Sequence, residues 1–336
     1  MKKFLLMSGL MLAGAAACAG QNAPAPPAPA PTATTGQTNQ PIVPVGLERV
    51  LIEAEKQTEK YREVFRNLIA VETKRTETYD SKGEAEDQDT VEANFLVYQS
   101  SKDGRTASEL RNVTKVNGKP IPESQAKSDQ FFAELGKEKT LESELKKIEK
   151  ESTKYARGLE VFGLTLNEGI VLKDNLRPYF DFTLQGTENF QGNQVYVVAY
   201  QQTRKSPYVT LNRDDDEARS NEPNLEFNLQ LPGALKKSDA LLRGKLWIDA
   251  QTFQIRREER ELTVAQAGAP IVLMTNIFEY QPSEYEILVP KQISLVTNEI
   301  KKRNNDYTAA REAKVIFDYS KFRKSNVEVV ILDDDQ

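Results

Sequence analysis

Few side chains in this sequence of 336 residues have types and spacings that could perform chemistry. The sequence contains no histidine and one cysteine, Cys18. This composition excludes enzymes that need an imidazole as base or relay, and zinc sites built from several thiolates. Two Ser-x-x-Lys pairs, Ser124 with Lys127 and Ser143 with Lys146, have the spacing at which a lysine activates a serine. Both lie in strongly charged helical sequence without the companion motifs of that chemistry, so we interpret them as exposed helix positions.

Carboxylates are the remaining candidates. The acidic run at residues 214–217 could hold calcium, but the EF-hand pattern requires a glycine where Arg219 stands and an acidic ligand where Leu225 stands. We therefore interpret this run as a polar loop. No P-loop, dinucleotide-binding or G-x-S-x-G motif occurs. The sequence predicts a protein that is not an enzyme and has no metal or cofactor, although a hydrolase using paired carboxylates stays an alternative among 50 acidic residues.

The N-terminus has the pattern of an export signal. Two lysines precede an apolar run, residues 4–17, that is too short to span a bilayer as a mature helix. Small alanines directly precede Cys18, and this pattern resembles the lipobox of bacterial lipoproteins, whose cysteine is lipidated and becomes the new N-terminus. Ala15 replaces the usual leucine of that motif, so ordinary signal cleavage is the alternative. Because residue 19 is not aspartate, the resemblance implies the outer membrane, facing the periplasm, or a soluble periplasmic protein if Cys18 is not lipidated.

Composition divides the chain into four parts. Residues 1–17 are the predicted signal peptide, and residues 18–45 are rich in proline and alanine and predict a disordered tether. Residues 46–325 predict a single folded domain, and residues 326–336 an acidic tail. The formal net charge of -5, from 45 basic and 50 acidic side chains, gives no reason to expect a nucleic-acid partner.

The periodicity of apolar residues predicts an α+β fold. Apolar residues recur at helical spacing from Leu47 to Leu68, and a helical insert is predicted from Ser124 to Ala156. Asp103-Gly104 and Asn117-Gly118 predict tight antiparallel hairpins. The remaining periodic segments predict a large curved, mostly antiparallel sheet. The predicted strands are residues 91–98, 179–184, 195–202, 225–231, 245–248, 253–264, 271–280, 291–298 and 313–322.

Two predicted strands are apolar on both faces, at residues 195–200 and 271–274. Such strands must be covered on both sides, and the predicted helices could lie across the concave side of the sheet. The space between would be an apolar cavity, although aromatic strand residues more often form ordinary core. The candidate lining residues of this cavity are Phe180, Phe182, Tyr196, Trp247, Phe278 and Tyr280.

The stretch from Gly244 to Arg257, GKLWIDAQTFQIRR, resembles the "G-x-L-W-I-D-x-x-T-x-x-I" strand-turn-strand of the periplasmic lipoprotein-carrier and lipoprotein-sorting proteins. The order of a leader, a long helix, strands, a helical insert and more strands is similar to that group as well. The resemblance implies an unclosed β-barrel with helices as a lid, in which Asp249 begins a turn and Trp247 packs inside.

The resemblance also implies a function, because members of that group bind acyl chains or lipidated polypeptides in an apolar cavity without catalysis. The sequence therefore predicts an exported envelope protein, anchored to the membrane by a lipid, that binds an acyl chain, a lipid or a lipidated protein. The alternative from another class is a ligand-free structural or adaptor lipoprotein. An apolar cavity of several hundred cubic ångströms would favour binding, and an interior filled by the chain's own side chains would favour the adaptor.

Overall fold

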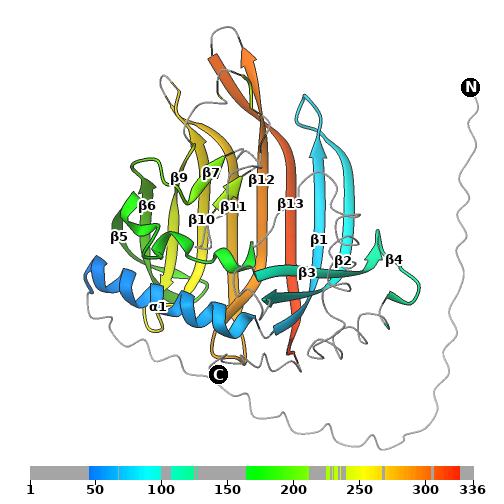
Figure 1. Ribbon diagram of the computed structural model, residues 1–336, viewed down its shortest axis with the longest axis horizontal. Helices are drawn as coiled ribbons and strands as arrows, with labels where there is room; N and C mark the ends of the chain where they lie inside the picture. The colour runs from blue at the N-terminus through cyan, green and yellow to red at the C-terminus, as the bar shows by residue number, and fades with distance from the viewer. Residues whose placement is uncertain are drawn as a thin grey trace, which may run out of the picture. The chain divides into compact units, whose positions relative to one another are not determined.

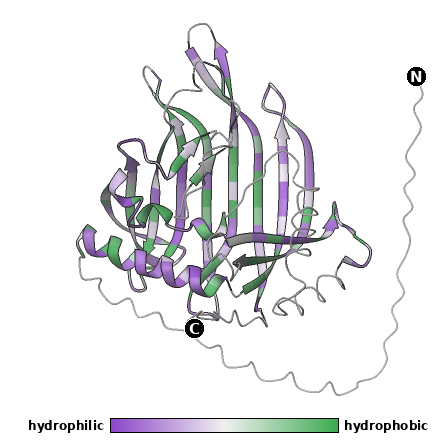
Figure 2. Ribbon diagram, viewed as in Figure 1, coloured by the Kyte–Doolittle hydropathy of each residue, from purple (hydrophilic) through white to green (hydrophobic). Residues whose placement is uncertain are grey.

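Helix α1 (Leu47–Phe65) forms where the sequence predicts an amphipathic helix. Apolar and polar residues alternate around it (Figure 2), and its apolar stripe is buried against the rest of the fold. The helix ends before Leu68, because Leu68 is the first residue of a strand and pairs with Lys324. The buried residues of α1 are Val50, Leu51, Ala54, Thr58, Tyr61, Arg62 and Phe65.

This computed structural model describes the central part of the chain, and all of the described residues lie within one unit, residues 42–336. The predicted signal peptide, nearly all of the tether and of the helical insert, the acidic run at residues 214–217, the Asp103-Gly104 turn and the acidic tail lie outside it. The described residues are 45–66, 68–99, 107–124, 126, 164–211, 225–227, 229, 231–233, 235, 240–266, 269–303 and 306–325.

The strands form one large antiparallel sheet (Figure 1), which the described residues build from 11 strands in the order β4-β3-β2-β1-β13-β12-β11-β10-β9-β6-β5. Strands β4 and β5 stand at the two ends of this order, so the sheet is not closed into a barrel. The predicted α+β fold with a large, mostly antiparallel, unclosed sheet is therefore confirmed. The strands are β1 (Leu68–Tyr79), β2 (Ala85–Gln99), β3 (Ala107–Val116), β4 (Lys119–Pro120), β5 (Phe180–Phe190), β6 (Asn193–Gln202), β9 (Ala240–Asp249), β10 (Ile255–Val264), β11 (Ile271–Pro282), β12 (Leu288–Arg303) and β13 (Asp306–Lys324).

The local sequence explains a predicted hairpin, and it also explains why one predicted strand is shorter than expected. Asn117 and Gly118 have φ values of 48° and 74° and turn β3 into β4, as a tight hairpin requires. The predicted strand at residues 225–231 is only three residues long, β8 (Leu225–Phe227), and pairs in parallel with β7 (Val209–Leu211) in a separate small sheet. The apolar residues of the predicted strand are packed in the core. Their spacing therefore reflects their burial and does not indicate a long strand.

The core lies on one face of the large sheet, which we call the inner face. Successive strand residues point to opposite faces, so Tyr196 and Val198 lie on the inner face while Val195 and Val197 lie on the outer face. All four are buried, which confirms that β6 is covered on both sides. Helix α1 packs against the inner face near one end of the sheet (Figure 1).

A second element covers the inner face between α1 and the strands. Residues 164–179, which we call the cover segment, contain three short 3-10 helices: η1 (Thr165–Asn167), η2 (Ile170–Leu172) and η3 (Arg177–Tyr179). Gly169 brings this segment close to the sheet and to α1, because a Cβ there would lie 2.5 Å from Ile255 Cδ1 and 2.7 Å from Thr58 Cγ2. The interior is thus a layer of side chains between the sheet and these two covers.

Candidate functional site

Five of the six aromatic residues predicted to line a cavity lie on the inner face, where they pack against neighbouring side chains. Phe180 and Phe182 pack with Tyr200, at ring-centroid distances of 5.9 and 6.3 Å. Tyr196 stacks on Phe253, 6.2 Å away. In another region, Tyr280 meets Tyr61 of α1 edge-on and Phe278 lies beneath the guanidinium of Arg260. Each of these rings therefore packs against other side chains of the fold. By their partners they fall into three groups: Phe180 with Phe182, then Tyr196, then Phe278 with Tyr280.

Trp247 lies on the outer face, so the expectation that it packs inside is wrong. Its neighbour Leu246 is fully buried on the inner face, and alternation along β9 turns Trp247 the other way. There the indole lies opposite Arg257, 5.5 Å from the guanidinium carbon, and Nε1 donates to Glu188 at 2.6 Å. Asp249, in contrast, begins the predicted turn by accepting the N–H groups of Gln251 and Thr252.

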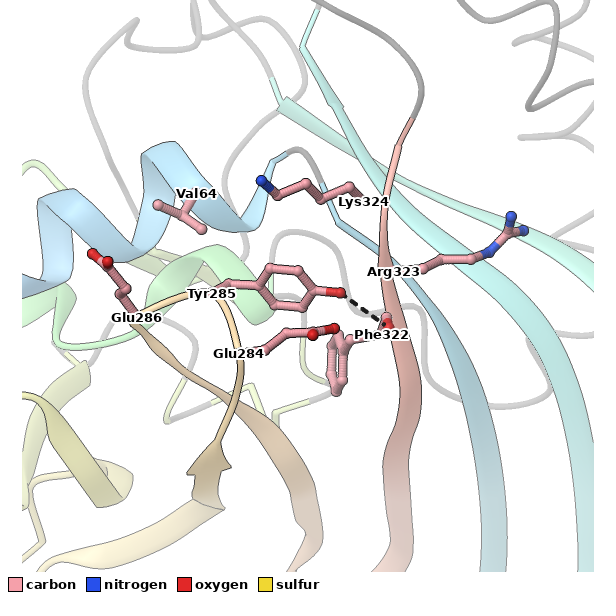
Figure 3. Close-up of a pocket in the computed structure, with 7 residues that line it drawn as sticks. All are labelled: Val64, Glu284, Tyr285, Glu286, Phe322, Arg323 and Lys324. Atoms are coloured by element: carbon pink, nitrogen blue, oxygen red, sulfur yellow. Dashed lines mark hydrogen bonds between the residues drawn. The ribbon is translucent and has the colours of Figure 1, made fainter.

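Two hollows lie at the two ends of α1, and both are open to solvent. The larger, about 640 Å³, lies between Val64, the β11–β12 turn and the end of β13 (Figure 3). There the Tyr285 hydroxyl donates to the Phe322 carbonyl oxygen at 3.2 Å. The smaller, about 480 Å³, has Phe180 and Phe182 in its wall, together with Leu47 and Leu51 of α1. Charged side chains line both of them.

The most ordered polar arrangement in the described residues is one that the sequence analysis missed. Side chains from α1, β3 and β10 hold the main chain of residues 164–169, at the start of the cover segment. We call these five side chains the clamp: Tyr61, Arg62, Glu109, Glu258 and Arg260.

Carbonyl oxygens of the cover segment accept hydrogen bonds from α1 and β10. Tyr61 Oη donates to the Thr165 carbonyl at 2.8 Å, and Arg62 donates through Nε to Leu166 at 3.1 Å and through Nη2 to Glu168 at 3.2 Å. Arg260 Nη2 donates to the Asn167 carbonyl at 2.9 Å.

Carboxylates accept the N–H groups of the same segment. Glu109 Oε1 accepts both the main-chain N–H and the hydroxyl of Thr165, each at 2.8 Å. Glu258 Oε2 accepts the N–H of Gly169 at 3.2 Å. The clamp therefore satisfies main-chain donors and acceptors that are buried inside the fold.

A guanidinium holds each clamp carboxylate in place. Arg260 donates through Nε and Nη2 to Glu258 Oε1 at 3.0 and 2.8 Å, and Tyr200 donates to the same oxygen at 2.8 Å. Gly244 makes room for Tyr200, because a Cβ there would lie 2.5 Å from the hydroxyl. Arg260 and Glu258 are 2% and 0% exposed, so this is a buried ion pair.

Glu109 belongs to a second buried ion cluster. Arg111 donates to both oxygens of Glu72, at 2.7 and 3.0 Å, and to Glu109 Oε2 at 3.0 Å. Its guanidinium carbon also lies 5.0 Å from the Phe95 ring centroid. Burial alone would lower the pKa of Arg111, but Glu72 and Glu109 raise it well above its ordinary value. Arg111 therefore keeps its charge inside the fold.

Glu168 differs from the other acids of the interior. Its side chain is buried, and its Oε2 has no hydrogen-bond partner among the described residues. Burial raises the pKa of this carboxyl well above its ordinary value, Arg62 offsets part of the rise and Glu258 adds to it. Glu168 is therefore protonated at a higher pH than an exposed carboxyl.

The clamp side chains bind and position the main chain of the cover segment. Within the described part of the chain, no group of three or more acidic or cysteine side chains is placed to hold a metal ion. Nor does an α-helix in that part have the length and apolar character needed to cross a bilayer.

Comparisons with known proteins find likeness in fold only. No family model and no curated protein matches this sequence. A solved structure of a DUF1329 family protein from Desulfovibrio piger matches at 9% identity, covers 83% of this chain and 93% of that chain, and has a TM-score of 0.36.

A LolA-superfamily protein from Nitrosomonas europaea matches at 10% identity over 85% of this chain and 96% of that chain, with a TM-score of 0.33. A putative outer membrane lipoprotein-sorting protein domain from Vibrio parahaemolyticus matches at 12% identity over 82% and 95%, with a TM-score of 0.34. Likenesses of this size do not indicate what this chain binds.

Proposed function

We propose that this protein is an exported envelope lipoprotein that binds an acyl chain, a lipid or a lipidated protein on the inner face of its sheet, without catalysis. In this proposal residues 1–17 are removed, Cys18 carries the lipid anchor and residues 18–45 form the tether. Residues 46–325 form the binding domain, followed by the acidic tail. The protein faces the periplasm from the outer membrane, or is soluble in the periplasm if Cys18 is not lipidated.

The observation that carries this proposal is the way in which the inner face is covered. Among the described residues, an apolar sheet face is packed against α1 and a short segment of 3-10 helices. Five apolar side chains of the cover segment fill this space, each at most 3% exposed: Leu164, Ile170, Val171, Leu172 and Leu176. A guest that displaces the segment finds a ready apolar surface.

The free energies of apolar burial allow an acyl chain to take the place of the cover segment. Five aliphatic side chains contribute about 8–15 kcal/mol of burial, at about 1.5–3 kcal/mol each. A chain of about 16 methylene groups contributes about 13 kcal/mol, at about 0.8 kcal/mol per group. The two terms are of equal size, so an acyl chain can replace the apolar contacts of the cover segment.

A second candidate function, the ligand-free adaptor, is favoured by a specific observation. The inner face is filled by the protein's own side chains, including Phe65, Ile170 and Leu172, none more than 1% exposed. The two hollows described above lie outside this layer, at the ends of α1. The hydrolase alternative gains no such support, because Glu109 and Glu258 are engaged by arginines and by the main chain.

Uptake of a fluorescent fatty acid, with mass spectrometry of co-purifying lipids, distinguishes the two functions. The full chain with Cys18→Ser is the sample, so that no anchor competes. We expect saturable uptake that Leu246→Arg on the inner face abolishes and Trp247→Ala on the outer face leaves unchanged. If the folded protein takes up no fatty acid and carries no amphiphile, the adaptor is correct.

The anchor has its own test. The Cys18→Ser chain should move from the membrane fraction to the soluble fraction on cell fractionation, because one residue carries the lipid. A variant that stays with the membrane would contradict lipidation at Cys18.

A further inference from the structure

We propose that the clamp is a binding site for polypeptide main chain, and that residues 164–169 are its internal occupant. The proposal rests on the proposed function, in which the cover segment can leave the inner face. In this proposal, the part of the guest that occupies the clamp is peptide and not acyl chain.

The clamp recognises main chain almost exclusively. Among the described residues its five side chains make six hydrogen bonds to main-chain atoms of residues 164–169, four to carbonyl oxygens and two from N–H groups. Its one bond to a side chain of this segment is to the hydroxyl of Thr165. Because every peptide carries the same main-chain groups, another polypeptide can take these positions.

The site stays assembled when its occupant leaves. Glu258 keeps its bonds to Arg260 and Tyr200, and Glu109 keeps its bond to Arg111. The charges of the carboxylates therefore remain neutralised, and the groups that face the segment remain in position. A site of this kind is preorganised for its ligand.

An acyl chain does not satisfy this site. It has no donor or acceptor, so Arg62 and the oxygens that face Thr165 and Gly169 would be left against hydrocarbon. A peptide replaces each bond of the internal segment with an equivalent one. A lipidated polypeptide can fill the clamp with its peptide and the neighbouring apolar face with its acyl chain.

Two positions of the occupant give the site a sequence preference. Thr165 places a hydroxyl on Glu109, and Gly169 has a φ of 51° and lies where a Cβ would collide with Ile255 and Thr58. The preferred guest sequence is therefore Thr-x-x-x-Gly.

Binding of a labelled peptide tests the proposal. The probe is LTLNEGIVL, the sequence of residues 164–172, and its matched control is the same peptide N-methylated at the threonine and the glycine. N-methylation removes the two main-chain donors that Glu109 and Glu258 accept, and it adds one methyl group at each position. On the full chain with Cys18→Ser, at up to millimolar peptide, we expect the methylated peptide to bind about tenfold or more weakly.

Two protein variants separate a change in the occupant from a change in the site. Thr165→Val weakens the internal occupant and should tighten peptide binding about threefold or more, because that segment competes at a high local concentration. Glu109→Gln weakens the site for the internal segment and for the guest alike, so the apparent affinity should stay nearly unchanged. If either variant does not fold, the comparison of the two peptides on the unsubstituted clamp still tests the proposal.

Absence of peptide binding, or equal binding of both peptides, overturns the proposal. Fatty-acid uptake in the same preparation separates it from the proposed function. Uptake without peptide binding removes the peptide site and leaves the acyl-binding function standing. Selective peptide binding without uptake supports the site and removes the acyl chain from the function.

Discussion

Removing the guanidinium of Arg260 is the sharpest test of the buried polar layer. The substitution Arg260→Met replaces the guanidinium by a shorter, unbranched apolar side chain and deletes two hydrogen bonds to Glu258 and one to the Asn167 carbonyl. Glu258 is 0% exposed and would keep bonds only from Tyr200 and Gly169. A buried carboxylate without its cation is costly, because neither water nor a counter-ion replaces the lost charge.

The expected loss of unfolding free energy is about 3–5 kcal/mol, the usual cost of removing one partner from a buried pair. A domain has only about 5–15 kcal/mol to lose, so the variant should be folded but much less stable. Urea unfolding followed by circular dichroism measures this change. Adding Glu258→Leu to Arg260→Met should restore part of the loss, because no unpaired charge then remains.

A matched ion pair on the outer face serves as the control. Arg243 Nε lies 2.7 Å from Glu261 Oε2, on neighbouring strands, with side chains 37% and 33% exposed. Arg243→Met should therefore cost less than about 1 kcal/mol. If Arg260→Met costs no more than this control, Glu258 is not held by a buried cation and the account of the clamp fails.

Gly244→Ala should lower stability by about 3 kcal/mol or more, because its Cβ would lie 2.0 Å from the Glu259 carbonyl oxygen, while Gly233→Ala at an open position should cost less than about 1 kcal/mol in thermal unfolding. The wavelength of maximum fluorescence of Trp247, the only tryptophan, should stay unchanged when a fatty acid binds, because Trp247 lies on the outer face. A change in this wavelength would indicate that the fatty acid does not bind on the inner face. Stability should fall as pH rises above 4.5, because buried Glu168 keeps its proton longer than the unfolded chain does. Its contribution is greatest in acid and is lost as pH approaches the raised pKa, so Glu168→Gln should flatten the pH dependence of the urea midpoint.

Helices and strands with a clear period of apolar residues could be predicted from the sequence. The stripe of α1 and the doubly buried strand β6 follow from which residues are apolar and at what spacing, since burial selects those residues directly. The short parallel pair β7–β8 could not be predicted, because three residues carry no period and parallel pairing depends on contacts distant in the sequence.

The clamp was missed because four of its five residues are charged, and apolar periodicity does not mark a charged residue as buried. Strand β10 contains Arg257-Glu258-Glu259-Arg260 in sequence, and charge alone does not say which two point inward. The signal lies in Leu262, which is buried on the inner face, because steps of two residues back from it reach Arg260 and Glu258. The same counting from Leu246 places Trp247 outside, where the resemblance had implied the opposite.

The two kinds of contact that hold the cover segment set different demands on a guest. Its aliphatic side chains can be replaced by any apolar chain of similar size, at no net cost in burial. Its main-chain bonds can be replaced only by groups that donate and accept at the same places, and each one left unmade costs about 1–3 kcal/mol. A bare fatty acid meets the first demand, but its carboxylate can only accept hydrogen bonds, so the N–H groups that Glu109 and Glu258 accept are not replaced. A lipidated peptide meets both and should therefore displace the segment at lower concentration than either a fatty acid or an unlipidated peptide of the same sequence.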